Sequence, residues 1–151
     1  MRLSIDANVL VYFVDRDAGE RHDRALQILD RASLADCALT LQTLGEFFPV
    51  ATRKSKIEPE VAEKFIEDWR QVFPVHAADL GAFDDALAAT RQHGLSFWDA
   101  MLWATVQQAG CQILLSEDFQ DGRRLGAVTF VNPFDPANTE LLTRALPELE
   151  S

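Results

Sequence analysis

Short apolar runs alternate along this chain with longer stretches in which apolar residues recur every three or four positions. Runs of the first kind predict buried strands, and stretches of the second kind predict helices with one buried side. The expected strands are Leu3–Ile5, Cys37–Leu41, Val72–Val75, Ile113–Leu115 and Val128–Val131. Strands that alternate with helices predict one parallel sheet with helices on both faces, whose strand carboxyl ends meet at one edge.

The helices between these strands are expected to bury apolar faces. They cover Val9–Val14, about Glu20–Leu34, a helix opening at Thr43–Glu46, one opening at Ile57–Glu60, Asp79–Gln92, Phe97–Ala109 and a short docked helix around Leu141, Leu142 and Leu146. Residues expected to face the core include Phe47, Val61, Phe65, Ile66, Trp69, Phe83, Ala86, Leu87, Phe97, Trp98 and Trp103. Pro49 is expected near the first turn of its helix, where proline is tolerated, and would kink the helix if it started earlier. Pro74 assigns its strand to a sheet edge.

The composition is typical of a globular protein with one domain, expected over residues 1–151. No apolar run approaches the roughly 20 residues that span a bilayer, and the N-terminus lacks a signal-peptide pattern. We therefore expect a cytoplasmic protein with no membrane partner. Cys37 and Cys111 lack the spacing of a zinc site and are expected to be buried free thiols.

Acidic residues take similar positions in several of the predicted units. Asp6 ends the first strand, and Glu46 lies in the first turn of the helix after the second. Asp118 follows the strand before it, with Asp121 three residues on, and Asp99 lies in the first turn of its own helix. Carboxylates gathered at the ligand-binding edge of such a sheet would repel one another without a cation. Because Mg²⁺ and Mn²⁺ take oxygen ligands, the pattern predicts a divalent-metal site that could bind a phosphodiester.

Each of these residues also has a local explanation that the sequence leaves open. Helix capping or turn formation would explain the patterns Thr43-x-x-Glu46 and Ser96-x-x-Asp99, an N-cap at Asp6, and a turn at Asp118 and Asp121. The polar companions Asn8 and Ser116 would orient a metal ligand in one interpretation and cap helices in the other. Convergence of the acids on one edge favours the metal site.

The net charge of −10 argues against a protein that binds nucleic acid through general electrostatics. Arg53, Lys54 and Lys56 form the densest basic cluster, and Arg123 and Arg124 form a second one. Such clusters usually belong to a solvated surface, but these are also the only candidates to hold a polyanion. The first cluster is therefore the candidate RNA-binding segment.

The ordered set of motifs resembles the PIN-domain nucleases, and within them the VapC-type ribonuclease toxins of bacterial toxin–antitoxin pairs. The motifs are Ile5-Asp6-Ala7-Asn8, Glu46-Phe47, Phe97-Trp98-Asp99-Ala100, Ser116-Glu117-Asp118-Phe119 and Val131-Asn132-Pro133-Phe134. Each motif alone is weak, whereas the set in this order spans nearly the whole chain and is specific.

The resemblance implies a three-layer α/β/α sandwich whose acidic quartet binds one or two Mg²⁺ or Mn²⁺ ions and cleaves RNA. The quartet corresponds to Asp6, Glu46, Asp99 and Asp118, supported by Ser116 and Asn8. Asp121 corresponds to a fifth, less fixed acid, and Glu117 competes for that role. The resemblance further implies a homodimer that is blocked by a small antitoxin, whose C-terminal segment enters the acidic groove, often with an arginine.

Together these observations predict a metal-dependent endoribonuclease. Asp6, Asp99, Asp118 and Asp121 are the predicted metal ligands, and Glu46 would be a ligand or would position the attacking water. The alternatives are a PIN-fold nuclease that acts on other RNA or DNA outside a toxin–antitoxin system, a haloacid-dehalogenase-like phosphatase, and a domain that only binds a partner. The phosphatase usually carries a second aspartate where this chain has Asn8.

Overall fold

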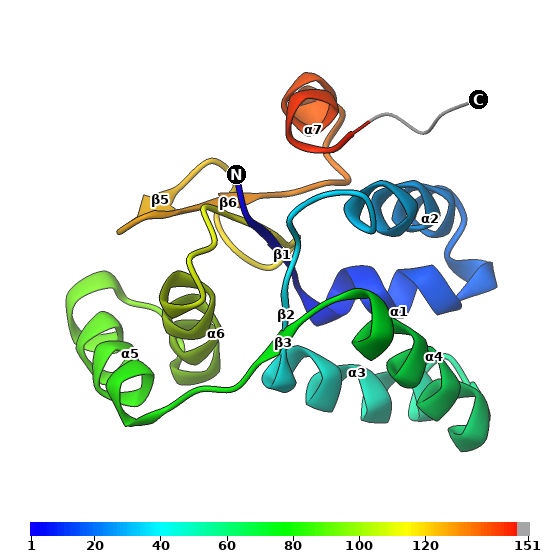
Figure 1. Ribbon diagram of the computed structural model, residues 1–151, viewed down its shortest axis with the longest axis horizontal. Helices are drawn as coiled ribbons and strands as arrows, with labels where there is room; N and C mark the ends of the chain where they lie inside the picture. The colour runs from blue at the N-terminus through cyan, green and yellow to red at the C-terminus, as the bar shows by residue number, and fades with distance from the viewer. Residues whose placement is uncertain (148–151) are drawn as a thin grey trace.

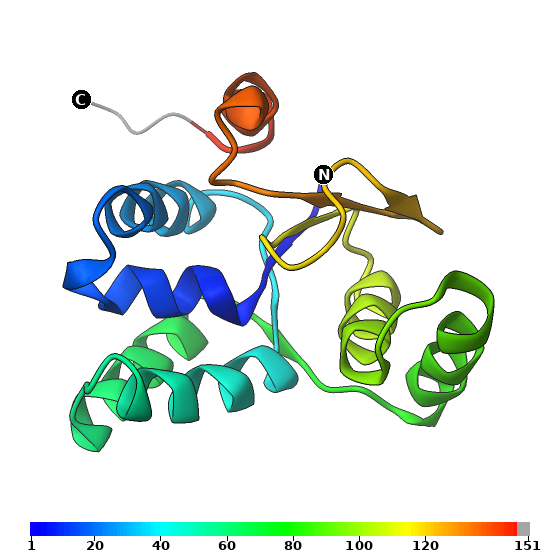
Figure 2. The same ribbon diagram turned by 180° about the vertical axis from the view of Figure 1, so that it is seen from behind.

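The computed structural model describes residues 1–147, in which helices cover both faces of a small sheet (Figures 1 and 2). The strands are β1 (Leu3–Ile5), β2 (Leu39–Thr40), β3 (Val75–His76), β4 (Ile113–Leu115), β5 (Arg124–Leu125) and β6 (Val128–Val131). The helices are α1 (Ala7–Val14), α2 (Glu20–Ala32), α3 (Leu41–Arg53), α4 (Pro59–Val72), α5 (Leu80–His93), α6 (Phe97–Gln108) and α7 (Thr139–Ala145). The predicted α/β/α sandwich is confirmed.

The sheet is parallel except at one edge. Strands β1, β4 and β6 pair in parallel, and β5 pairs antiparallel with β6. Strands β2 and β3 form a separate parallel pair, which a single bridge between Leu3 and Cys37 joins to β1. The prediction of an all-parallel sheet missed β5, because this strand has only two residues and its hairpin depends on Gly126 at a φ of 57°.

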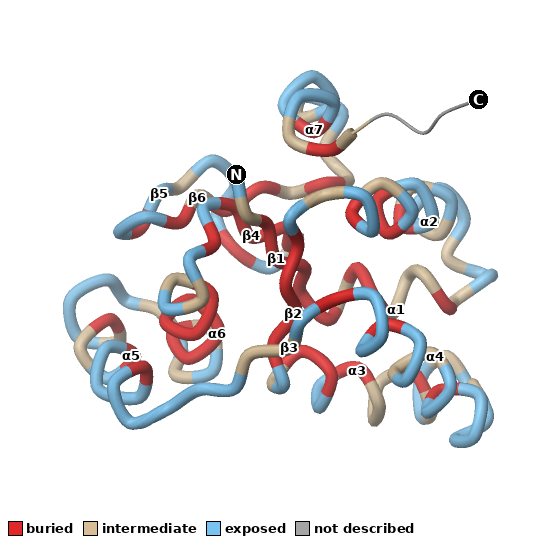
Figure 3. Tube along the Cα trace, in the orientation of Figure 1, coloured by how far each residue is buried: buried red, intermediate tan, exposed pale blue. Residues whose placement is uncertain are grey.

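The central strands β1 and β4 are buried (Figure 3), and the alternation of their side chains divides the interior into two cores. Leu3, Ile5 and Val131 face one core, which α1, α2, α3, α4 and α7 complete. Leu114 and Phe130 point the opposite way, into a core completed by α5 and α6. Successive residues of a strand alternate between its faces, so β1, β4 and β6 separate the two cores.

Helix α3 begins earlier than the sequence pattern indicates. Thr40 Oγ1 accepts a hydrogen bond from Thr43 N at 3.0 Å, so Thr40 is the N-cap and the expected strand Cys37–Leu41 ends early. The predicted capping box at Thr43 is therefore wrong, and Glu46 lies in the second helical turn. Pro49 consequently lies in the helix interior, where a first-turn position was expected.

Several large residues expected in the core are exposed. Val61 is 46% exposed, Phe83 and Leu87 are each 39% exposed, and Trp98 is 63% exposed. In α5 the buried positions are all alanines, namely Ala82, Ala86 and Ala89, and in α4 Ala62 is buried together with Trp69. Small side chains allow helix backbones to approach closely, and the larger neighbours then remain outside. The expected strand Val72–Val75 is also shifted, because Val72 belongs to α4.

Other predictions about the chain are confirmed. Cys37 and Cys111 are buried free thiols, and Trp103 is buried. Helix α7 docks through Leu142 and through Leu146 at its C-cap, whereas Leu141, which was expected to dock with them, is 39% exposed. Within residues 1–147, no helix has both the length and the apolar character needed to cross a membrane.

Arg31 of α2 anchors the end of α7. Its guanidinium donates to the carbonyls of Leu146 at 2.7 Å and Pro147 at 2.9 Å, and more weakly to those of Leu142 and Thr143. Carbonyls at a helix C-terminus lack partners within the helix, so this one side chain satisfies several of them.

We predict that Arg31→Ala lowers the free energy of unfolding by ~1–3 kcal/mol, the usual effect of losing charged hydrogen bonds. Urea unfolding and hydrogen exchange of the α7 amides would measure this loss. Arg144→Ala is the matched control, because Arg144 makes only an exposed ion pair with Glu140 and should change stability by less than about 1 kcal/mol. Equal losses in the two variants would contradict the assignment.

Candidate functional site

A cleft of about 420 Å³ opens at the carboxyl ends of the central strands. Asp6, Glu46 and Asp118 line it, and they come from the end of β1, from α3 and from the loop after β4. The other lining residues are Ala7, Asn8, Val11, Tyr12, Asp15, Val50, Lys54 and Ser55. The parallel topology therefore brings three predicted acids into one cleft, although they lie far apart in the sequence.

The hydroxyl of Ser116 connects the polar groups of this cleft. It donates to Asp6 Oδ2 at 2.7 Å and accepts from Asp118 N at 3.1 Å and from Asn8 Nδ2 at 3.3 Å. Because a hydroxyl has one proton and two lone pairs, these contacts use its full capacity. Ser116 thus orients Asp6 and fixes the start of the loop that carries Asp118.

Asn8 presents an oxygen that has no partner. Its amide nitrogen donates to Asp118 Oδ2 at 3.0 Å and to Ser116 Oγ at 3.3 Å. Both acceptors require a donor, so the amide cannot be turned over without losing these bonds. Asn8 Oδ1 is consequently left buried with no hydrogen-bond partner among the described residues. Such an atom costs free energy until a cation or a water meets it.

Asp6 is a buried carboxyl group at a strand end. It is 4% exposed, and Ala7 N donates to its Oδ1 at 2.7 Å, so it also caps α1. Burial raises the pKa of Asp6 from 3.8 to about 6. The Ser116 and Ala7 hydrogen bonds act in the opposite direction, and the negative charges of Glu46 and Asp118 add to the rise. A cation in the cleft would reverse this penalty.

Glu46 and Asp99 approach from helices on opposite sides of the sheet. Gln42 Nε2 donates to Glu46 Oε1 at 2.7 Å and also to the carbonyl of Trp98 at 2.9 Å. Trp98 precedes Asp99 in the first turn of α6, where Ser96 Oγ accepts from Asp99 N at 3.4 Å. The predicted Ser96 cap is thus present. Asp99 does not line the cleft, but Gln42 brings its helix start beside Glu46.

The two candidates for a fifth acid have other partners. Asp121 accepts from Asn132 N and from Asn138 Nδ2, and it fastens the segment after β6. Glu117 accepts from the hydroxyl of Tyr12 and from Arg21 Nε at 3.1 Å. Neither carboxylate lines the cleft. The metal role of Asp121 stays a prediction. In this structure the Asp121 carboxylate is hydrogen-bonded to Asn132 and Asn138.

Glu117 also changes the chemistry of Tyr12. Burial and the neighbouring Glu117 carboxylate raise the pKa of Tyr12 to about 12. The Tyr12 ring packs edge-on against Phe134 at 5.1 Å between centroids, and the Arg21 guanidinium lies over both rings. Tyr12 is therefore a hydrogen-bond donor that steadies the loop between Ser116 and Asp118, and it remains protonated at neutral pH.

Only one member of the predicted basic segment reaches the acidic cleft. Lys54, the C-cap of α3, lines the cleft with Ser55. Arg53 and Lys56 are exposed beside it and are absent from the lining. An ammonium group on the rim of an acidic cleft provides one positive charge to a bound phosphate.

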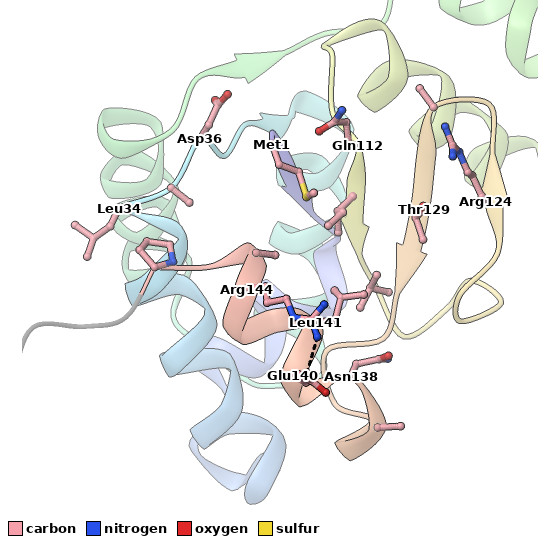
Figure 4. Close-up of a pocket in the computed structure, with 17 residues that line it drawn as sticks. Met1, Leu34, Asp36, Gln112, Arg124, Thr129, Asn138, Glu140, Leu141 and Arg144 are labelled. Carbon is pink, nitrogen blue, oxygen red and sulfur yellow. Dashed lines mark hydrogen bonds and ion pairs between the residues drawn. The ribbon is translucent and has the colours of Figure 1, made fainter.

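A larger groove of about 950 Å³ lies between α7 and the sheet (Figure 4). Its walls carry Thr129 and Leu141, with Arg124 toward one end. Its acids Asp36 and Glu140 are paired with arginines. This groove therefore gathers no set of free carboxylates, and the smaller cleft remains the candidate site.

The residues of the smaller cleft fit a hard divalent cation. Among residues 1–147, no group of three or more His, Cys, Asp or Glu side chains is arranged to hold a metal ion by itself. Mg²⁺ does not need one, because it keeps several waters and commonly binds through one or two carboxylates. Asp6, Asp118 and the unpartnered Asn8 oxygen provide the kind of donors that it takes.

Sequence reasoning missed several residues that shape the site. Tyr12 and Asp15 line the cleft, and Gln42 joins Glu46 to α6. The i and i+4 spacing of Gln42 and Glu46 on one helix predicts their contact. Nothing in the sequence indicates the contact between Gln42 and Trp98, which depends on how α3 and α6 pack.

We predict that, with chelator present, Asp6 makes the protein less stable as the pH rises from about 4 to 7. The folded state binds this proton more tightly than the unfolded state, so the stabilisation is full below pH 3.8 and is lost as the pH passes about 6. A rise from 3.8 to about 6 corresponds to ~3 kcal/mol. Urea unfolding of the native protein and of Asp6→Asn across this range should diverge accordingly.

Asp79 provides a control of opposite sign. Hydrogen bonds from Ala82 N and Gln108 lower its pKa, so its contribution to stability is lost as the pH falls below about 4. A pH-independent difference between the native protein and Asp6→Asn would contradict the raised pKa of Asp6.

Comparison with known proteins agrees with this geometry. A family model described as the PIN domain matches residues 3–124. VapC20 of Mycobacterium tuberculosis, a sarcin–ricin-loop-cleaving toxin, superposes with a TM-score of 0.63 at 19% identity, over 77% of this chain and 91% of that chain. A toxin–antitoxin complex from Klebsiella pneumoniae gives 0.64 at 21% identity, over 88% and 98% of the two chains.

VapBC-1 from nontypeable Haemophilus influenzae gives a TM-score of 0.62 at 13% identity, over 89% of this chain and all of that one (100%). The comparison with curated protein sequences finds no match. At these identities the solved structures establish the fold, whereas the family match covers most of the chain. The acids at the carboxyl edge of the sheet and the match over residues 3–124 together show that this chain belongs to the PIN domain family.

Proposed function

We propose that the protein is a divalent-metal-dependent endoribonuclease and the toxin of a toxin–antitoxin pair. The observation that carries the proposal is the buried, hydrogen-bonded Asp6 beside an unpartnered buried oxygen of Asn8, in a cleft that also holds Glu46 and Asp118. Carboxylates without a cation make this arrangement costly, and a bound cation would offset the cost.

The residues proposed to hold Mg²⁺, or Mn²⁺ in its place, are Asp6, Asp99 and Asp118, directly or through water. When bound, the cation supplies positive charge to a phosphodiester oxygen and lowers the pKa of a water that attacks phosphorus. Glu46 would be a further ligand or would accept a hydrogen bond from the attacking water. Its exposed position on the cleft wall suits either role.

The polar side chains around these acids would orient the carboxylates and would neutralise part of the charge of a bound phosphate. The Ser116 hydroxyl donates a hydrogen bond to Asp6 Oδ2 and so holds the Asp6 carboxylate in one orientation. Lys54 on the cleft rim would contact a non-bridging phosphate oxygen and hold the RNA backbone. Arg53 and Lys56 would add weaker, salt-sensitive attraction at the surface.

The toxin assignment is supported by the proteins with which this fold is shared. The similar structures include a sarcin–ricin-loop-cleaving toxin and toxin–antitoxin complexes. A net charge of −10 and an acidic cleft would favour an antitoxin whose inserted segment carries a basic residue. The proposal includes a homodimer, in line with the family resemblance.

The alternative functions agree with the observed fold and cleft to different degrees. Membership of the PIN domain family argues against the haloacid-dehalogenase-like phosphatase. A nuclease acting on DNA would use the same metal site, since the chemistry at phosphorus does not require the 2′-hydroxyl. A domain that only binds a partner would keep the fold and the cleft but would cleave nothing.

We predict that the purified protein cleaves single-stranded RNA with Mg²⁺ or Mn²⁺ and not with chelator. Asp6→Asn, Asp99→Asn and Asp118→Asn should each lower the cleavage rate by on the order of 100-fold or more, because each removes a carboxylate proposed to hold the cation that would stabilise the negative charge of the transition state. Asp84→Asn is the matched control, since this exposed carboxylate on α5 lies outside the cleft. Cleavage of labelled RNA, with folding checked by circular dichroism, measures these rates.

Metal-independent cleavage, or an Asp6→Asn protein as active as Asp84→Asn, would contradict the proposal. Faster cleavage of DNA than of RNA of the same sequence would change the proposed substrate from RNA to DNA. Measurable Mn²⁺ binding without cleavage of either would favour the binding-only domain.

A further inference from the structure

We propose that Gln42 is a positioning residue that sets the spacing between Glu46 and the start of α6, and hence between two of the acids assigned to the metal site. The inference rests on the proposed function and adds a residue that does not touch the reacting atoms. Its basis is the single side-chain amide shared between two helices.

The geometry uses both protons of one nitrogen. Gln42 Nε2 donates to Glu46 Oε1 at 2.7 Å and to the carbonyl oxygen of Trp98 at 2.9 Å. The first bond lies within α3, and the second crosses 56 residues of sequence to α6. Since the carboxylate oxygen of Glu46 and the carbonyl oxygen of Trp98 both act as acceptors, the amide can satisfy them only with its nitrogen, which fixes its orientation.

This contact bridges the two cores of the protein. Helix α3 completes one core and α6 completes the other, with the central strands between them. Within residues 1–147, the bond from Gln42 to Trp98 is the only hydrogen bond that joins α3 to α6. The relative position of Glu46 and Asp99 therefore depends on this bond as well as on the packing of two separate cores.

The start of α6 is held by a backbone bond from Ala100 N to the Ser96 carbonyl at 2.9 Å, by the packing of Phe97 against Phe83 and by the Ser96 cap. The Ser96 cap is long, at 3.4 Å, and the Trp98 side chain is 63% exposed, so burial does not fix this residue. Among the described residues, the Asp99 carboxylate accepts no hydrogen bond. Among the described residues, Gln42 makes the only hydrogen bond from outside α6 and its Ser96 cap to the peptide unit that joins Trp98 to Asp99.

Gln42 also fixes Glu46. One carboxylate oxygen, Oε1, is held by Gln42, and no described residue donates to Oε2. A carboxylate held at one oxygen keeps a defined rotamer and has the other oxygen available to the cleft. Groups that orient metal ligands from outside typically change metal affinity by about 10–100-fold when they are removed.

The test is Gln42→Met, which keeps the length and helix propensity of the side chain but donates no hydrogen bond. Gln108→Met is the matched control, because Gln108 Nε2 likewise donates to a carboxylate, that of Asp79, at 2.9 and 3.0 Å. We expect Gln42→Met to weaken Mn²⁺ binding by about 10-fold in calorimetry of the protein without RNA. With RNA, kcat should fall more than KM rises, and the thermal midpoint should match that of Gln108→Met.

Trp98 provides a readout that needs neither metal nor activity. Trp69 and Trp103 are buried, whereas Trp98 is exposed, so acrylamide quenching of the tryptophan fluorescence reports mainly on Trp98. Gln42→Met should increase the local motion of Trp98, and Gln108→Met should not.

The possible failures are distinguishable. Unchanged Mn²⁺ affinity and unchanged acrylamide quenching of Trp98 in Gln42→Met would overturn the inference, while loss of activity in Asp6→Asn alone would leave the proposed function standing. A native protein that neither binds Mn²⁺ nor cleaves RNA would overturn the proposed function and this inference together. Loss of affinity with a lowered thermal midpoint would assign Gln42 to general stability and would also contradict the positioning role.

Discussion

The site depends on one interaction, the hydrogen bond from the Ser116 hydroxyl to the buried carboxylate of Asp6. Burial alone would make Asp6 a neutral acid, and its raised pKa reflects that cost. Ser116 and the Ala7 amide offset part of the cost, and they hold the carboxylate in one orientation. The same hydroxyl accepts from Asn8 and from the Asp118 backbone, so Ser116 connects Asp6, Asn8 and Asp118 through its hydrogen bonds. A buried carboxylate with incomplete compensation is suited to a group that must accept a cation.

The fold explains why these residues meet. Parallel pairing of β1 with β4 places Ile5 beside Leu115, so the residues that follow, Asp6 and Ser116, emerge together at the same edge. The two cores on opposite faces of the sheet position Glu46 and Asp99 independently. Precision at the site therefore cannot come from one core alone. A polar link across the edge, as at Gln42, is a direct way to couple the two halves.

Much of this arrangement could be predicted from the sequence because it follows from topology. The convergence of Asp6, Glu46 and Asp118 could be predicted from the order of the strands and from the rule that parallel strands share a carboxyl edge. The antiparallel edge strand was missed because two residues carry too little periodicity. Trp98 was placed in the core because periodicity counts apolar residues without knowing that alanines would take the close contacts between helices. The contacts of Asp121 with Asn132 and Asn138 join segments whose meeting depends on loop geometry, which no local pattern encodes.

The central claim is that the cleft of Asp6, Asn8 and Asp118 is built to receive a divalent cation. The most direct test is anomalous diffraction from crystals of the protein soaked in Mn²⁺. We predict an anomalous peak within the cleft, with Asp6, Asp118 and the Oδ1 atom of Asn8 facing the ion directly or through water, and no such peak in Asp6→Asn crystals. A cleft without a peak at saturating Mn²⁺, or a peak only elsewhere on the molecule, would contradict the claim.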